Sequence, residues 1–108
     1  MNDLIEQYAK LVSDNMREAY SFVSNQDEYA RYGCTVQYGQ KYAKLVIYNG
    51  QNSVHAFVDI NTLDVYKPAS WKIPAKGVRY NLNNDLQKIA EIMKIDSAYA
   101  GHYLYKRR

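Results

Sequence analysis

A basic segment between Asp64 and Asp85 carries the side chains best suited to bind a ligand. It contains Trp71, two prolines, no acidic residue and four cations: Lys67, Lys72, Lys76 and Arg79. Ammonium and guanidinium groups neutralise phosphates, and an indole ring stacks on a nucleobase. The prolines restrict the backbone, so less entropy is lost when a ligand binds. The segment is therefore predicted to be a preorganised loop that binds an anionic ligand.

The predicted ligand-binding residues are these cations and the neighbours that can stack on a ligand or hydrogen-bond to it: Lys67, Ser70, Trp71, Lys72, Lys76, Arg79 and Tyr80. A secondary basic patch is expected at Lys106, Arg107 and Arg108. Four phosphate contacts to a duplex predict roughly hundredfold weaker binding when salt rises from ~50 to ~200 mM. A nucleotide in a compact pocket should respond less to salt, and both ligands remain open. The opposing interpretation is a buried Trp71 among ordinary solvated lysines.

No combination of residues carries a catalytic or metal-binding signature. His55 and His102 are the only histidines, and no cysteine or carboxylate spacing beside them resembles a zinc ligand set. His55 and Asp59 are four residues apart, which on a strand separates them by about 13 Å and prevents direct contact. The chain has no glycine-rich phosphate loop. We therefore expect a protein that is not an enzyme and uses neither a metal nor a cofactor.

Charge is distributed unevenly along the chain. The formal net charge is +3, yet residues 1–30 contain six acidic and two basic residues, whereas residues 31–108 contain five acidic and twelve basic residues. A positive face raises the local concentration of phosphate-bearing ligands. The alternative is that many small basic domains bind no nucleic acid. The sequence therefore favours an anionic partner without identifying it.

Tyrosine is unusually frequent, with twelve in 108 residues. Its large rigid ring and hydroxyl group are common at binding surfaces. Four tyrosines follow helix or strand patterns and are predicted to pack in the core: Tyr8, Tyr20, Tyr42 and Tyr48. Five others are the expected ligand or interface residues: Tyr66, Tyr80, Tyr99, Tyr103 and Tyr105. So many tyrosines on a small surface also predict a homo-oligomer.

Size and composition predict a single domain over residues 1–108. The apolar fraction of 47% and the charged fraction of 23% are typical of a soluble globular protein. No window approaches the ~20 apolar residues of a membrane span, and the first residues do not resemble a secretory signal. Cys34 is the only cysteine and cannot form an internal disulfide. These features predict a cytoplasmic protein without a membrane partner.

Apolar periodicity predicts an α+β fold. Residues 3–24 have the three- and four-residue spacing of an amphipathic helix, which Asp3 and Glu6 begin as a capping box. Residues 41–48 and 53–60 are strand-like and flank an Asn-Gly turn, which predicts an antiparallel pair. A short strand at 65–67 completes a three-stranded meander that ends at the basic loop.

A second, shorter helix is predicted from Asn84 to about Lys94. Residues 27–40 form a polar, tyrosine-rich connection whose structure stays open, and residues 96–108 could form an edge strand, a docking arm or a frayed end. The predicted architecture is an N-terminal amphipathic helix packed on a small antiparallel β-meander, with the second helix near the C-terminus.

Three stretches resemble a family of small, mostly uncharacterised bacteriophage proteins. The first is Ser-Val-His-Ala-Phe-Val-Asp at residues 53–59, and the second, residues 64–82, contains Lys-Pro-Ala-Ser-Trp-Lys-Ile-Pro-Ala-Lys-Gly-Val-Arg. The ending Tyr-Leu-Tyr-Lys-Arg at residues 103–107 is similar as well. Leu63 departs from the pattern, since the family turn usually has glycine there. The resemblance implies a phage or prophage product in the host cytoplasm, and small phage proteins of this kind often block a host defence.

Two functional hypotheses follow. The first is a non-catalytic phage-type binding protein that recognises nucleic acid or a nucleotide through the basic aromatic loop and acts against host defence. The second is a protein-binding inhibitor or structural interaction module, in which tyrosines form the interface and the loop cations meet an acidic host protein complex.

Overall fold

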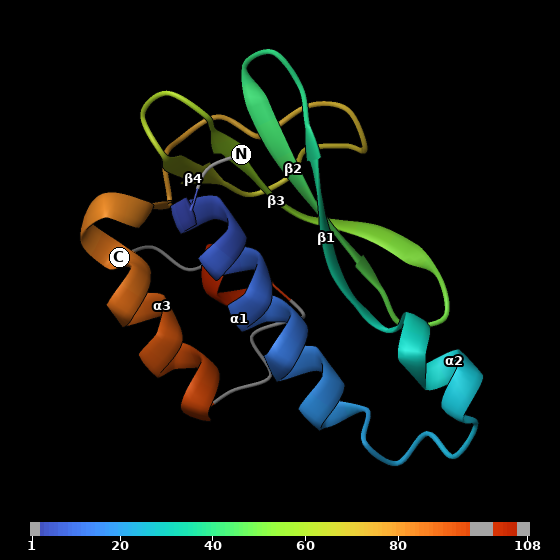
Figure 1. The fold of residues 1–108 in the computed structure, drawn as a ribbon. Helices are drawn as coiled ribbons and strands as arrows, with labels where there is room; N and C mark the ends of the chain where they lie inside the picture. The colour runs from blue at the N-terminus through green and yellow to red at the C-terminus, as the bar shows by residue number, and fades with distance from the viewer. Residues whose placement is uncertain (1–2, 96–100, 106–108) are drawn as a thin grey trace.

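The computed structural model describes residues 3–95 and 101–105 and has two layers, with helices against one face of an antiparallel sheet (Figure 1). This is the predicted α+β fold. Its elements in chain order are α1 (Asp3–Ala19), α2 (Gln26–Arg31), β1 (Gly33–Tyr38), β2 (Tyr42–Tyr48), β3 (Asn52–Asp59), β4 (Asp64–Tyr66), β5 (Tyr80–Asn81), α3 (Leu82–Ile95) and the 3-10 helix His102–Leu104. Within the described part of the chain, no helix is both long and apolar enough to span a bilayer.

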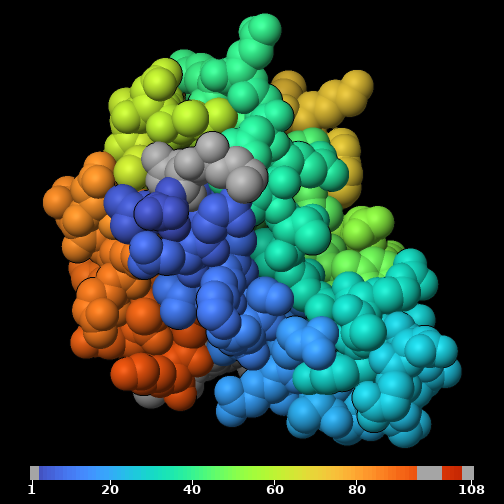
Figure 2. All heavy atoms as spheres, in the orientation of Figure 1, coloured from blue at the N-terminus to red at the C-terminus, as the bar shows by residue number. Residues whose placement is uncertain are grey.

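Helix α1 packs its apolar stripe against the sheet and is shorter than predicted. Its buried residues are Ile5, Tyr8, Ala9, Val12 and Met16. Asp3 and Glu6 lie in its first turn, where carboxylates interact favourably with the helix dipole. The helix ends at Ala19, although the apolar period continues to Val23. Beyond its end, the Tyr20 ring packs edge-on against Tyr32 at a centroid distance of 5.3 Å. In Figure 2, α1 (blue) lies between α3 (orange) and the β1–α2 side of the molecule.

The sheet has five strands, in the order β1-β2-β3-β4-β5, with every neighbouring pair antiparallel. The predicted strands at 41–48, 53–60 and 65–67 are confirmed as β2, β3 and β4 within one residue at each end. The prediction that the sheet ends at the basic loop is wrong, since the chain returns after the loop and pairs as β5 with β4. The open connection at 27–40 contains α2 and the edge strand β1, which pairs with β2 along its full length.

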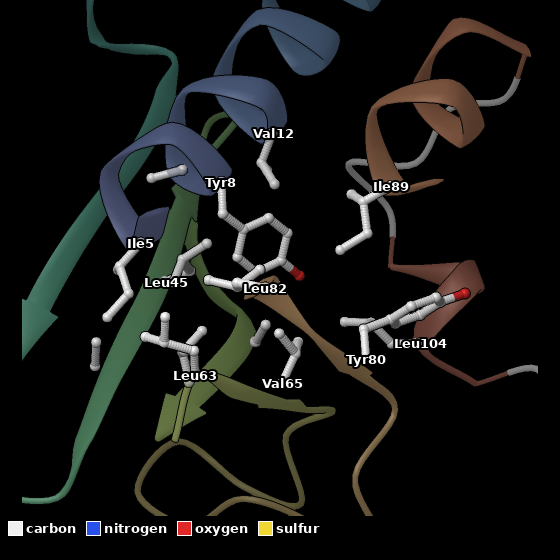
Figure 3. Close-up of a cluster of buried hydrophobic side chains, with 14 of the residues drawn as sticks. Ile5, Tyr8, Val12, Leu45, Leu63, Val65, Tyr80, Leu82, Ile89 and Leu104 are labelled. Carbon is white, nitrogen blue, oxygen red and sulfur yellow. The ribbon is translucent and has the colours of Figure 1, made fainter. Parts of the chain in front are cut away.

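The two faces of the sheet have different partners. On β2, the side chains of Ala43, Leu45 and Ile47 belong to the core cluster on the helix side. Tyr42 and Lys44 alternate with them, so their side chains lie on the opposite face, which we call the outer face. A β-bulge shifts the register between Leu45/Val46 and β3, where His55 is the extra residue. Figure 3 shows the core that results between α1, α3 and the strands.

The turn between β3 and β4 places Leu63 in the left-handed region, with φ at 66°. Glycine adopts this conformation without steric strain, whereas leucine does not. A left-handed non-glycine residue costs about 1–2 kcal/mol. The Leu63 side chain is buried in the core, and such burial contributes about 1.5–3 kcal/mol. Burial therefore offsets the backbone strain.

Helix α3 begins two residues before its predicted start. The Asn81 side chain accepts a hydrogen bond from the Asn83 main-chain N–H at 2.9 Å, and Asp85 Oδ2 accepts one from the Asn81 N–H at 2.8 Å. This reciprocal capping satisfies main-chain donors that the helix itself leaves without partners. The predicted cap at Asn84 is therefore wrong, because Asn81 supplies it. Leu82 and Ile89 are buried against the core.

The described C-terminal residues dock onto the core. Tyr103 and Leu104 of the 3-10 helix are 5% and 0% exposed. Of the three predicted alternatives, the docking arm is therefore correct for residues 101–105. The prediction that Tyr103 is a ligand or interface residue is wrong, because its ring is enclosed. Tyr99 and the predicted basic patch at Lys106, Arg107 and Arg108 lie outside the described residues.

Candidate functional site

The first half of the basic segment folds as a small hairpin, residues 67–75, which we call the tryptophan hairpin. An isolated β-bridge joins Pro68 to Pro74. The Ala69 N–H donates to the Ile73 main-chain oxygen at 2.9 Å, and the Ala75 N–H donates to that of Lys67 at 2.8 Å. At the tip, Ser70 Oγ accepts from the Lys72 N–H at 3.3 Å. These bonds order the backbone around the tip, as expected of a preorganised loop.

Trp71 lies at the tip of the tryptophan hairpin and is 45% exposed. The opposing interpretation of a buried indole is therefore wrong. The Nζ of Lys44 lies 4.6 Å from the Trp71 ring centroid and 5.9 Å from that of Phe57. A cation over an aromatic face at such distances is stabilising by about 0.5–1 kcal/mol at an exposed site. This contact holds the hairpin tip over the outer face of the sheet, and in Figure 1 the segment (gold) extends past β2 on the side away from α3.

A cleft of about 330 Å³ lies beside the hairpin tip. It is lined by Gln37, Tyr38, Gly39, Gln40, Lys41, Tyr42, Lys44, Phe57 and Lys72. Three of these residues are lysines, and no acidic side chain lines the cleft among the described residues. The volume lies within the range of small-ligand sites, whose walls combine apolar rings with a few polar groups. The cleft can therefore receive a compact anion with an attached ring.

Aromatic rings form the floor of this part of the outer face. The Tyr42 ring packs edge-on against Phe57 at 6.2 Å and against Tyr66 at 5.9 Å between centroids. Lys41 Nζ lies 5.4 Å from the Tyr42 centroid. Edge-to-face pairs of this kind add about 0.5–1.5 kcal/mol beyond area burial. The floor is therefore packed, and the predicted interface residue Tyr66 is part of it and half-buried.

A family model matches almost the whole chain, from residue 1 to residue 106. The chain belongs to a family of unknown function, DUF7717. No curated protein and no solved structure matches it. The family description names no activity, so the function of this DUF7717 chain has to be argued from its own site. The bacteriophage origin suggested by the resemblance stays a prediction.

Sequence reasoning found only part of the site in the DUF7717 chain. Of the predicted residues, Lys72 lines the cleft and Trp71 lies beside it, in contact with the cleft residue Lys44. Lys41 and Lys44 were missed, because they lie just before β2 and within it, distant from the basic segment in sequence. The alternation of polar and apolar residues along β2 would have placed Lys44 on the face opposite the core. Only the fold, however, brings the tryptophan hairpin over that face.

The other predicted cations occupy separate positions. Lys67 Nζ lies 4.7 Å from the Tyr105 ring centroid. Lys76 is exposed and does not line the cleft beside Trp71. The Arg79 side chain is half-buried, and its Nε is enclosed without a hydrogen-bond partner among the described residues. The structure therefore groups one of the four predicted cations, Lys72, with Trp71 at this cleft.

Tyr80 is not a surface residue of the loop. It is 5% exposed, belongs to β5 and donates its hydroxyl hydrogen to the main-chain oxygen of Tyr103 at 3.4 Å. Figure 3 shows its ring beside Leu104 in the core. The prediction that Tyr80 binds the ligand is wrong, because the return of the chain as β5 buries the ring.

No metal centre or acid–base pair accompanies the cleft. Across residues 3–95 and 101–105, no group of three His, Cys, Asp or Glu residues could hold a metal ion. His55 Nε2 is hydrogen-bonded to the Tyr103 hydroxyl at 2.7 Å. Asp59 Oδ1 instead accepts from the main-chain N–H groups of Asn61 and Thr62 at 2.8 and 3.0 Å. The expectation that His55 and Asp59 do not pair agrees with these partners.

Cys34 is a partly buried thiol, and this environment controls its reactivity. Burial, with a smaller contribution from Glu6, raises the pKa of Cys34 to about 12. The folded protein favours the neutral thiol, so the stabilisation that this provides is lost as the pH rises from about 9 to about 12. At pH 8 we expect iodoacetamide to alkylate the native protein roughly 10³-fold more slowly than the urea-unfolded chain, because only the thiolate reacts. Mass spectrometry of timed samples measures both rates, and equal rates would show that the thiol is accessible.

Proposed function

We propose that this DUF7717 protein is a non-catalytic binding protein that recognises nucleic acid or a nucleotide at the cleft beside the tryptophan hairpin. The observation that carries the proposal is a cleft lined by three lysines, Lys41, Lys44 and Lys72, and by no acidic side chain in its described lining. The exposed indole of Trp71 lies beside this cleft, with Lys44 over its ring. The ammonium groups neutralise phosphate, and the Trp71 ring stacks on a base. Neither role requires a metal or a catalytic group.

The charges of the cleft are available to a ligand. Within the described residues, the ion pairs join Lys10 to Asp14 and Arg31 to Glu28, so none of the three cleft lysines is neutralised by a carboxylate. Asp64, on β4, accepts hydrogen bonds from the Thr62 hydroxyl and from the Asn81 side chain. The positive potential of the three cleft lysines favours anions over neutral ligands.

Removing the indole tests the proposal directly. We expect Trp71→Ala to weaken binding of a fluorescein-labelled ten-nucleotide thymidylate, or of ATP, by about 5- to 150-fold, because stacking of one base is worth about 1–3 kcal/mol. Lys72→Ala should weaken binding and reduce its salt dependence, whereas Lys88→Ala, an exposed lysine on α3, should change neither. Fluorescence anisotropy measures the affinities. Trp71 is the only tryptophan, so quenching of its emission reports stacking independently.

Two results would reject the proposal. One is the absence of measurable binding of any nucleotide or oligonucleotide at low salt. The other is binding that Trp71→Ala and Lys72→Ala leave unchanged, which would place the ligand elsewhere on the molecule.

A second candidate function is a protein interface, and the observation that favours it is the apolar surface of the basic segment. Trp71, Ile73 and Val78 are all exposed. A protein partner would cover these side chains and pair acidic groups with the neighbouring cations. The tyrosines give this candidate less support, since only Tyr38 and Tyr105 are exposed among those described. Light scattering of the purified protein tests the proposed homo-oligomer.

A role in the cytoplasm of a bacteriophage host is part of the same proposal. The sequence resemblance supports the phage origin, and the single, partly buried thiol, Cys34, agrees with a reducing compartment. A protein that sequesters a nucleotide or a nucleic acid there would deprive a host defence of its signal or its substrate. Infection of a host that expresses the protein, with and without Trp71→Ala, measures that effect.

A further inference from the structure

Three hollows follow one another across the outer face of the sheet. The first is the cleft beside Trp71. The second, of about 390 Å³, includes Trp71 itself and is lined by Asn52, Ser53, Val54, Pro68, Ala69, Ser70, Trp71 and Tyr105. The third, of about 420 Å³, lies where α2 meets β1 and β2 and includes Arg31, Tyr48 and Asn52. Asn52 lines the second and third hollows, and the neighbours Trp71 and Lys72 line the second and the first, so the three form one path.

The path has cations at its two ends and aromatic rings in all three hollows: the first hollow is lined by three lysines and the third by Arg31, whereas the second has no cation in its described lining. Its described lining contains no acidic residue and four cations: Lys41, Lys44, Lys72 and Arg31. Rings recur beside them at Tyr42, Phe57, Trp71, Tyr105 and Tyr48. Of these rings, Trp71 and Tyr105 are exposed. Proteins bind single strands by combining cations, which follow the phosphates, with exposed rings, which stack on unpaired bases.

The length of the path distinguishes a polymer from a single nucleotide. Its first hollow includes Tyr42 and its third includes Tyr48, the two ends of β2, and seven residues of strand extend for about 20 Å. A mononucleotide fills one hollow of this size, whereas a strand of about four nucleotides, the lower end of known single-strand site sizes, spans all three. A duplex would keep its bases paired and leave the exposed rings unused.

We propose that the ligand is single-stranded nucleic acid, bound along the outer face from the Lys41 end of β2 to the Arg31 end. This rests on the proposed function and adds two features: the ligand is single-stranded, and it lies along the outer face of the sheet. Trp71 stacks on a base near the middle of the strand, and Arg31 binds a phosphate at the far end from Lys41.

One acidic side chain competes at that far end. Glu28 lies 3.8 Å from the Arg31 guanidinium, which also lies over the Tyr48 ring at 4.6 Å from its centroid. Glu28 further accepts a hydrogen bond from the Tyr48 hydroxyl at 3.2 Å. A bound phosphate replaces Glu28 as the partner of Arg31. Glu28→Gln should therefore tighten binding of a strand that reaches Arg31.

The experiment compares ligands of different length on the same variants. Anisotropy titrations use labelled thymidylates of two, four and ten nucleotides, with thymidine monophosphate as a competitor and a matched uridylate to separate DNA from RNA. We expect affinity to rise at least tenfold from two to four nucleotides and little more beyond. Arg31→Ala and Tyr105→Ala should weaken the longer strands at least threefold and leave the monophosphate unchanged, whereas Lys72→Ala should weaken both. Circular dichroism verifies that each variant is folded.

The outcomes separate this inference from the proposed function. If affinity does not depend on strand length and Arg31→Ala does not change it, the extended path is wrong. A nucleotide site beside Trp71 would then remain the proposal. Tighter binding of a ten-base-pair duplex than of its single strands also overturns the inference, while phosphate recognition stands. If no nucleic acid or nucleotide binds at low salt, the proposed function itself fails.

Discussion

Replacing Tyr103 with alanine is expected to lower the free energy of unfolding by about 3–5 kcal/mol, the loss typical of a large aromatic side chain removed from a core. Tyr103 is buried, and its hydroxyl lies 2.6 Å from that of Tyr8 and 2.7 Å from His55 Nε2. Burial raises the pKa of both tyrosines, so the pair stays protonated well above neutral pH. The side chain therefore joins the C-terminal segment to α1 and to β3 at one point.

Tyr103→Phe separates the two contributions of that side chain. The ring remains, but Tyr8 and His55 each lose this hydrogen-bond partner, which should reduce stability by about 1–3 kcal/mol. Tyr105→Ala is the matched control, since Tyr105 is exposed and two residues away, and we expect a change within about 0.5 kcal/mol. Urea unfolding followed by circular dichroism measures all three variants. Equal losses for Tyr103→Ala and Tyr105→Ala would contradict docking of the C-terminal segment.

Local sequence signals predicted the strands that have a strong pattern and missed those that do not. β2 and β3 combine β-branched and aromatic residues with an Asn-Gly turn between them, and both signals are local. β1 is an edge strand whose core contacts come only from partly buried side chains such as Cys34 and Val36. Its pairing with β2 stabilises a segment that has little strand character of its own. β5 has two residues and exists through its pairing with β4, which no local pattern can indicate.

Site residues that are neighbours in the sequence were predicted, whereas those that only the fold brings together were missed. Trp71 and Lys72 are neighbours in an unusually basic segment, whereas Lys44 reaches them only through the packing of the hairpin on β2. A sequence pattern cannot tell whether a tyrosine is buried or exposed, because its side chain has an apolar ring and a polar hydroxyl group. Tyr103 was assigned to the surface, yet its hydroxyl is satisfied by Tyr8, 95 positions away. A sequence window cannot contain such a partner.

Arg17 connects α2 to α1. α2 has six residues, none of them buried, and a helix of that length is not stable alone. Arg17 Nη1 donates to the main-chain oxygens of Tyr29 and Tyr32 at 3.0 and 2.8 Å, and its guanidinium lies 4.3 Å from the Tyr29 centroid. The Tyr29 hydroxyl donates back to the Arg17 main-chain oxygen at 2.7 Å. These contacts fasten the end of α2 to α1.

Arg17→Met is therefore expected to release α2 from α1 and to reduce its local stability by about 2–4 kcal/mol, since each hydrogen bond from a charged donor is worth about 1.5–3 kcal/mol. Hydrogen exchange of the amides in residues 26–32 should accelerate by the corresponding factor, while the core strands change little. Lys10→Met is the matched control, because it removes the same charge from α1 at an exposed ion pair of small energetic value. Unchanged exchange in Arg17→Met would mean that other contacts hold α2.

The same variant connects stability to the proposed strand path. α2 supplies Arg31 and forms one wall of the third hollow, but it does not line the cleft beside Trp71. Release of α2 should therefore weaken ten-nucleotide strands and leave thymidine monophosphate unaffected, the result also expected of Arg31→Ala. Arg17 itself does not line any of the three hollows. If Arg17→Met weakened the binding of both ligands equally, release of α2 would also disturb the cleft beside Trp71. The inference that α2 forms the wall of a separate subsite would then be wrong.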